Sequence, residues 1–123
     1  MIVPQKLTDA SLLAEASVEM HMSDARGIPL LHDGDRFGAD IIEFPPHGRV
    51  EEHTHPGAHM LFVLSGSGQV VRRGVPTSLA SGKCYLVASE EPHSVAAGPH
   101  GLRLLVVGND HRHVGSRERL QCS

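Results

Sequence analysis

The chain has 123 residues and a mass of 13.2 kDa, the size of one ordinary domain with a single hydrophobic core. Apolar residues make up 40% and charged residues 20%, a composition typical of a globular protein rather than a disordered chain or a coiled coil. A net charge of -3, with one Tyr and three Phe, argues against nucleic-acid binding, because that function needs a basic surface and residues for base stacking.

The N-terminal residues 1–20 carry acidic side chains and short apolar runs, so they do not resemble a secretory signal. No segment approaches the ~20 apolar residues that span a bilayer, which argues against a membrane partner. Two cysteines, Cys84 and Cys122, give no disulfide framework. We therefore expect a cytoplasmic protein with free thiols.

A short helical stretch is expected at residues 8–16, where Thr8 or Asp9 could cap one or two turns. Strand patterns dominate the rest of the chain and are predicted at residues 17–22, 38–44, 59–65, 68–73, 84–89, 93–97 and 102–107. Glycine-rich turn signals separate them, among them SGSG at 65–68 and AGPHG at 97–101. This spacing predicts an all-β, antiparallel sandwich or barrel.

The sequence shows no internal repeat and no interior linker, which predicts one domain over residues 1–123. Its last segment, about 109–123, is polar and rich in Arg, and we expect a tail that frays or crosses to a partner subunit.

The segment EEHTHPGAHML, residues 51–61, concentrates three of the ten histidines of the chain. His53 and His55 are two residues apart, so on a strand both rings point to the same face. Pro56 and Gly57 then form a turn, after which His59 can return on an antiparallel strand to the same place. Several neutral imidazoles in an apolar interior are costly unless something coordinates them, so the cluster predicts a metal site.

Two longer segments resemble the paired signatures of the cupin superfamily. Residues 48–66, GRVEEHTHPGAHMLFVLSG, resemble the first signature, and residues 79–93, LASGKCYLVASEEPH, resemble the second. This resemblance implies a single-domain antiparallel jelly-roll β-barrel with a core at about 37–107. The implied metal ligands are four histidines: His53, His55, His59 and His93.

One departure from the cupin pattern changes the expected chemistry, because His59 stands where cupins commonly carry Glu. Four imidazoles favour Fe, Ni, Zn, Cu or Co over Mn, and they leave the charge of a divalent ion uncompensated. A small anionic, oxygen-rich substrate is therefore expected. Two open positions on a six-coordinate ion would suit a bidentate substrate, or a substrate plus O₂.

The resemblance implies a metal-dependent enzyme, most like the cupin dioxygenases that act on quercetin and diketones. A redox-neutral isomerase, cyclase or lyase could use the same ion as a Lewis acid. From other classes, a non-catalytic sensor or sugar-binding module and a storage-like barrel with structural zinc remain open.

Two further residues are candidates for catalysis. Glu51 shares the strand parity of His53 and His55, so its carboxylate could face the site as a general base, or it could be a rim glutamate facing solvent. Tyr85 could supply a hydroxyl to the pocket, or it could be a packing residue with a solvated tip. The second His-x-His pair, His111 and His113, has no acidic or sulfur partner nearby, so we interpret it as incidental.

A homodimer is expected from the run MLFVL at residues 60–64. Met60, Phe62 and Leu64 lie on the face opposite His59, where one small barrel does not readily bury all three.

Overall fold

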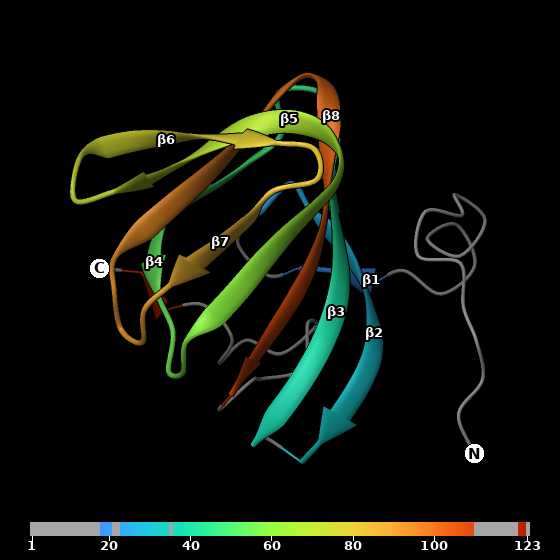
Figure 1. The fold of residues 1–123 in the computed structure, drawn as a ribbon, viewed down its shortest axis with the longest axis vertical. Coiled ribbons are helices and arrows are strands. Elements are labelled where there is room, and N and C mark those ends of the chain that lie inside the picture. Colours follow the sequence, from blue (N-terminus) through green and yellow to red (C-terminus); the bar gives the residue numbers. More distant parts are fainter. Residues whose placement is uncertain (1–17, 21–22, 35, 110–120, 123) are drawn as a thin grey trace.

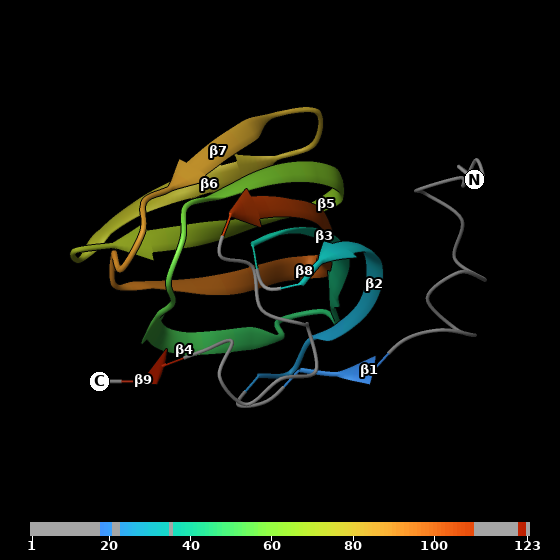
Figure 2. The ribbon, with the colours of Figure 1, turned by 90° about the horizontal axis from the view of Figure 1, so that it is seen from below.

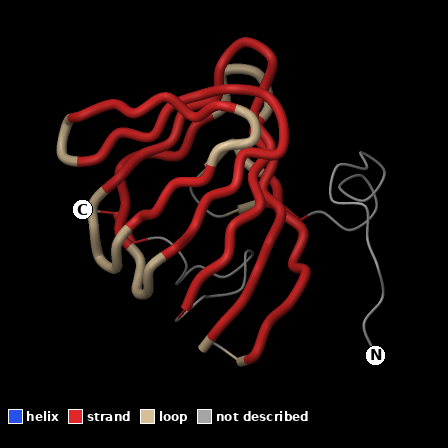
Figure 3. The backbone as a smooth tube through the Cα atoms, viewed as in Figure 1, coloured by secondary structure: helices blue, strands red, loops and turns tan. Residues whose placement is uncertain are grey.

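The computed structural model describes residues 18–20, 23–34, 36–109 and 121–122, and within these ranges it is built from strands without a helix (Figures 1 and 3). The strands are β1 Val18–Glu19, β2 Arg26–Asp33, β3 Phe37–Phe44, β4 Arg49–Thr54, β5 His59–Arg72, β6 Val75–Ala80, β7 Cys84–Val87, β8 His93–Asn109 and β9 Gln121–Cys122. The part of the chain that the structure describes contains no helix with the length and apolarity needed to cross a membrane. The helix expected at 8–16 lies outside the described residues.

The two longest strands, β5 and β8, pair with each other and belong to both layers of the fold (Figure 2). The C-terminal half of β8 pairs with β3 and with the beginning of β5, which in turn pairs with β7. The N-terminal half of β8 pairs with β4 and with the end of β5, which continues to β6. All these pairings are antiparallel, so the predicted all-β jelly-roll architecture is confirmed.

Glycines let β5 and β8 bend together instead of ending each strand. A Cβ atom on Gly66 would lie 2.2 Å from the carbonyl oxygen of Gly101, and one on Gly68 would lie 2.3 Å from that of Ala96. Any larger residue would therefore push the two backbones apart. The register between β5 and β8 shifts at these positions, as expected where a strand passes from one layer to the other.

The interior between the layers is filled by alternate residues of the strands. On β8, Leu102, Leu104 and Val106 are buried, while the side chains between them are half-buried on the other face. The other members of the main core come from most of the remaining strands and include Ile42, Phe44, Val50, Leu61, Val63, Val70, Leu79, Val87 and Val95. The buried histidines, His53, His55, His59 and His93, line a cavity together with several of these core residues.

The described end of the polar tail does not extend away from the domain. In β9, Gln121 pairs with Thr54 and Cys122 pairs with His53, so β9 lies along the edge of β4 in the same chain. Main-chain pairing to an otherwise open strand edge holds these two residues, and residues 110–120 of the predicted tail lie outside the described residues.

Candidate metal centre

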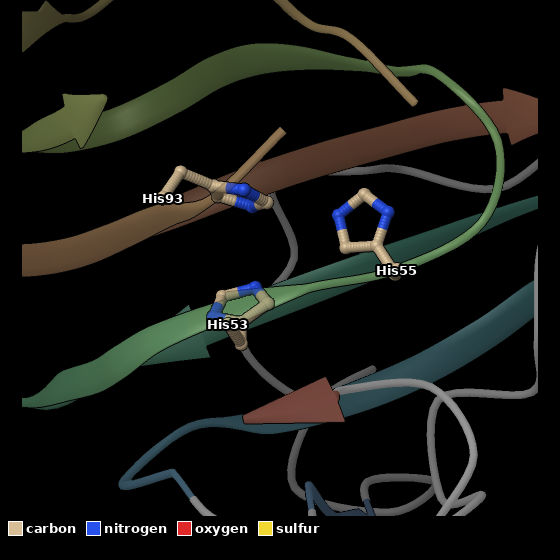
Figure 4. A group of neighbouring side chains, drawn as sticks. All are labelled: His53, His55 and His93. Atoms are coloured by element: carbon tan, nitrogen blue, oxygen red, sulfur yellow. The ribbon is translucent and has the colours of Figure 1, made fainter. Parts of the chain in front are cut away.

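Three of the predicted ligands come together at one end of the interior (Figure 4). His53 lies in β4, His55 follows that strand directly, and His93 begins β8. All three are buried, with 4%, 5% and 4% of their surface exposed, while Thr54 between the first two is half-buried on the opposite face. His53 and His55 are thus buried on the same side of the chain, as their two-residue spacing predicts, although β4 ends between them.

Backbone register places the third ring beside the first. His53 and His93 are directly paired across β4 and β8, and their ring centroids are 4.2 Å apart. One potential ligand atom from each of His53, His55 and His93 lies within 4.8 Å of the others. Since two nitrogens on one ion are at most about 4 Å apart, a small rotation of the rings would bring all three onto a metal.

Two of the rings are held in the tautomer that a metal requires. Nδ1 of His53 donates a hydrogen bond to the Glu51 carbonyl oxygen at 2.7 Å, and Nδ1 of His93 donates to the Glu91 carbonyl oxygen at 2.7 Å. A carbonyl can only accept, so the proton sits on Nδ1 and the lone pair sits on Nε2. The donor set of this cluster therefore fits a transition metal.

Burial lowers the pKa of His93 below its usual value of 6.5. The hydrogen bond to the Glu91 carbonyl and the Glu91 charge act in the opposite direction, while the positive charge of Arg72 adds to the lowering. At neutral pH this imidazole is consequently uncharged, and its lone pair is available for coordination.

The metal content of the protein is expected to fall as the pH drops below about 6, because a protonated imidazole cannot ligate and its free pKa is about 6.5. The pKa of His93 is lower in the folded state than in the unfolded state, so the metal-free fold loses stability as the pH falls below about 6.5. Metal analysis after dialysis at stepped pH measures the first effect, and thermal unfolding of the metal-free protein measures the second. Full metal occupancy at pH 4 would contradict the histidine assignment and indicate carboxylate ligands.

The fourth predicted ligand, His59, lies in the wall of the same cavity. It opens β5, is 4% exposed, and stacks on the His55 ring with centroids 4.0 Å apart and an interplanar angle of 18°. It is outside the group of three whose ligand atoms converge. Coordination by His59 therefore stays a prediction, although its ring is already against that of a ligand candidate.

The cavity that the four histidines share has a volume of about 50 Å³, enough for an ion and a few water-sized groups. Among the described residues that line it, the histidines are the polar ones. The others are Met20, Ile42, Phe44, Val50, Leu61, Val87, Val95, Leu104 and Val106. A charged group in this cavity would consequently have to be stabilised from the histidine end.

The carboxylate of Glu51 does not face this cavity. It forms an ion pair with Arg49 at 3.0 Å, and its side chain is 66% exposed. The two-residue spacing from His53 does not put Glu51 on the same face, because a β-bulge between Val50 and His53 adds a residue to β4. Glu51 contributes its carbonyl oxygen to the site instead.

Tyr85 also lies outside the cavity lining. Its ring packs against the main core, and its hydroxyl oxygen accepts a hydrogen bond from the Ala80 backbone N–H at 3.2 Å. The residue thereby closes the turn between β6 and β7, which agrees with the packing alternative. The predicted pair His111 and His113 lies outside the described residues.

Hydrogen bonds to residues distant in sequence fix the turn between His55 and His59. The Gly57 N–H donates to Ser89 Oγ at 3.0 Å, and the Ala58 N–H donates to Asn109 Oδ1 at 2.8 Å. The Glu90 N–H also donates to the carbonyl oxygen of His55 at 3.0 Å. These partners are up to 51 residues away in sequence, so no local pattern could have identified them.

Comparisons with known proteins agree with this architecture. Residues 40–108 match the family model of the Cupin domain. Dimethylsulfoniopropionate lyase DddW from Ruegeria pomeroyi is 35% identical over 63 residues, which cover 51% of this chain and 41% of the lyase. The chain thus matches less than half of the length of that relative.

Solved structures of similar fold include enzymes of different reaction types. The polyketide cyclase RemF from Streptomyces resistomycificus matches with a TM-score of 0.73 and 25% identity, over 97% of this chain and 89% of RemF. Salicylate 1,2-dioxygenase from Pseudaminobacter salicylatoxidans matches with a TM-score of 0.64 and 18% identity, over 70% of this chain and 26% of the dioxygenase. At that lower identity, the likeness to the dioxygenase is one of fold.

Proposed function

The chain belongs to the cupin superfamily, and from that premise we propose a metal-dependent enzyme that acts on a small anionic, oxygen-rich substrate. The observation that carries the proposal is the convergence of His53, His55 and His93 at the polar end of a buried, otherwise apolar cavity. We propose His59 as a fourth ligand, which would make the first shell entirely imidazole.

For the reaction, we favour a redox-neutral cyclisation or elimination. RemF, whose structure aligns with 97% of this chain, is a polyketide cyclase, and DddW, whose sequence aligns with 51%, is a lyase. Neither type of reaction consumes O₂. A β-dicarbonyl substrate, which ionises at the carbon between its two carbonyl groups to give an enolate, fits both the cyclase likeness and the expectation of an anionic ligand.

A divalent metal bound here would supply Lewis-acid stabilisation of an enolate oxygen. The protein's own contribution is positional. The carbonyls of Glu51 and Glu91 hold the rings of His53 and His93 in the ligating tautomer, and the apolar cavity walls exclude water around the charged oxygen. Polar attraction at one end and apolar packing at the other would orient a substrate with its oxygens toward the histidines.

The dioxygenase reaction is the second candidate, supported by the same donor set. Neutral imidazoles favour iron, nickel or copper, and a six-coordinate ion would retain open positions for a substrate and O₂. A non-catalytic ligand-binding module is the third.

One experiment separates these functions. Protein prepared without a His-tag would be analysed for metal and then screened against β-dicarbonyl compounds and enediols, with substrate loss and O₂ uptake recorded together. Substrate loss without O₂ uptake supports the cyclase or lyase, whereas stoichiometric O₂ uptake supports the dioxygenase. Saturable binding without turnover supports the binding module, and a protein that neither binds metal nor any of these compounds contradicts the proposal.

We also propose that the protein forms a homodimer through the outer face of β5 and β7. Met60 and Leu86 are directly paired there, and they are 43% and 58% exposed. Exposed apolar side chains side by side are typical of an interface. Light scattering is expected to give a dimer for the parent and a monomer for Met60→Glu, while Val75→Glu, at a 64% exposed position near the hairpin of β5 and β6, should leave the dimer intact. A parent that is monomeric at every concentration would contradict the prediction.

A further inference from the structure

Four directly paired residues on neighbouring strands form a row across one layer, from His59 at the cavity to His32 on β2. His59 on β5 is paired with Gly108 on β8, Gly108 with Gly38 on β3, and Gly38 with His32 on β2. The two central positions carry no side chain. No side chain from these two positions therefore separates the imidazoles of His59 and His32.

The His59 ring covers the Gly108 position. A Cβ atom on Gly108 would lie 2.2 Å from Cδ2 of His59 and 3.0 Å from its Nε2. The ring thus lies directly over the Gly108 backbone, and it extends from β5 toward β3. Any larger residue at position 108 would displace it.

Asp40 lies in the adjacent row of the same inner face. It is paired with Val106 across β3 and β8, which makes it a diagonal neighbour of Gly108. Diagonal positions in an antiparallel sheet are about 7–8 Å apart, within reach of longer side chains. The Asp40 side chain and the His59 ring thus lie in neighbouring rows of the same inner face, on the two sides of the Gly38–Gly108 pair.

Asp40 is also a buried carboxyl group that lies outside the cavity lining. It is 0% exposed, and Oδ1 lies 2.9 Å from Nε2 of His32, whose side chain is 18% exposed. Burying a carboxylate is costly even when it is paired, and replacing such a pair by apolar residues is often neutral or stabilising. Packing alone does not account for this buried carboxylate, whereas a role beside the histidine cavity, one row of residues away, would account for it.

We propose that Asp40 is a positioning residue of the metal centre: its carboxylate, anchored by His32, supplies a negative charge and a hydrogen-bond acceptor beside His59. The inference rests on the proposed metal-binding function. Asp40 on β3 would then partly compensate the charge of the ion. In the cupin pattern, the carboxylate that does so commonly stands at the position of His59. Asp40 acts through His59 rather than by contact with the substrate.

The test compares carboxylate-to-amide changes on the two faces of β3. Asp40→Asn is expected to weaken Zn²⁺ and Co²⁺ binding, measured by competition with a chelator, by about 10- to 100-fold, as is typical when a partner of a metal ligand is removed. The Co²⁺ absorption bands should shift as well, because the position of His59 changes. Glu43→Gln removes the outer-face ion pair with Arg103, at 2.9 Å, and should change neither property.

A second variant covers the case in which Asp40→Asn does not fold. His32→Gln keeps the carboxylate but removes the ring that anchors it, and several-fold weaker metal binding is expected, with His100→Gln at an exposed position as its control. Unchanged metal affinity and an unchanged Co²⁺ spectrum in the folded variants would overturn the role of Asp40 while leaving the metal site intact. A parent protein that binds neither ion would overturn both this inference and the proposed function.

Discussion

Replacing His55 by alanine should abolish most metal binding, with an affinity loss greater than about 100-fold. That bound follows because loss of a residue that merely supports a ligand already costs about 10- to 100-fold. His55 lies in the converging group, its ring centroid is 4.9 Å from that of His93, and its carbonyl oxygen helps to hold the ligand turn. The alanine variant keeps that backbone bond and loses one donor nitrogen.

The matched controls are His111→Ala and His113→Ala, which remove imidazoles of the other His-x-His pair. Metal content of untagged protein, measured after exhaustive dialysis, should remain near the parent value in both controls. Circular dichroism would establish that His55→Ala is folded before its metal content is compared. Equal metal loss in all three variants would contradict the assignment of the site to residues 53–93.

Part of the histidine cluster was predictable from the sequence because it depends on local geometry. The two-residue spacing of His53 and His55 puts both rings on one face of an extended segment, and the Pro56–Gly57 turn brings the chain back at His59. His93 followed from the resemblance to the second cupin signature. Its pairing with His53 is a matter of strand register, which no local pattern encodes.

Glu51, two residues before His53, does not share the face of that histidine, because the strand between them is interrupted. The bulge after Val50 inserts one residue, so Val50 and His53 are both buried while the two glutamates between them are exposed. A single irregularity of this kind changes the face of every residue beyond it. Sequence alternation alone did not reveal where it falls.

Glycine-rich segments gave the main error in strand boundaries. SGSG at 65–68 and AGPHG at 97–101 were interpreted as turns, but both lie inside long strands, β5 and β8. Their glycines permit close approach of the two backbones, a requirement that depends on the opposing strand. The position of Asp40, one row from His59, likewise depends on pairing across several strands, which no local pattern encodes.

The His59→Glu variant should keep a metal but bind an anionic ligand much more weakly. A carboxylate oxygen can replace the imidazole nitrogen, and metal preference should move toward harder ions such as Mn²⁺. The charge of the site falls by one unit, from about +1 to 0 if the Asp40 carboxylate is counted with a divalent ion. One unit at roughly 4 Å corresponds to about 4 kcal/mol at an effective dielectric of 20, a ceiling of about 1000-fold in affinity that solvent and ligand reorganisation will reduce.

Titration calorimetry on metal-loaded protein tests this expectation with a β-diketonate anion and a neutral ligand of similar shape. His59→Glu should weaken the anion far more than the neutral ligand, because only the former responds to the added negative charge. His59→Ala is the matched control, because it removes the same imidazole without adding a charge. Its affinity for the anion, measured with the metal bound, should fall less than its affinity for the metal. If His59→Glu binds the anion as tightly as the parent, the imidazole shell does not select for negative charge. An enolate substrate would then lose its main physical support, and a neutral substrate would fit the apolar cavity better.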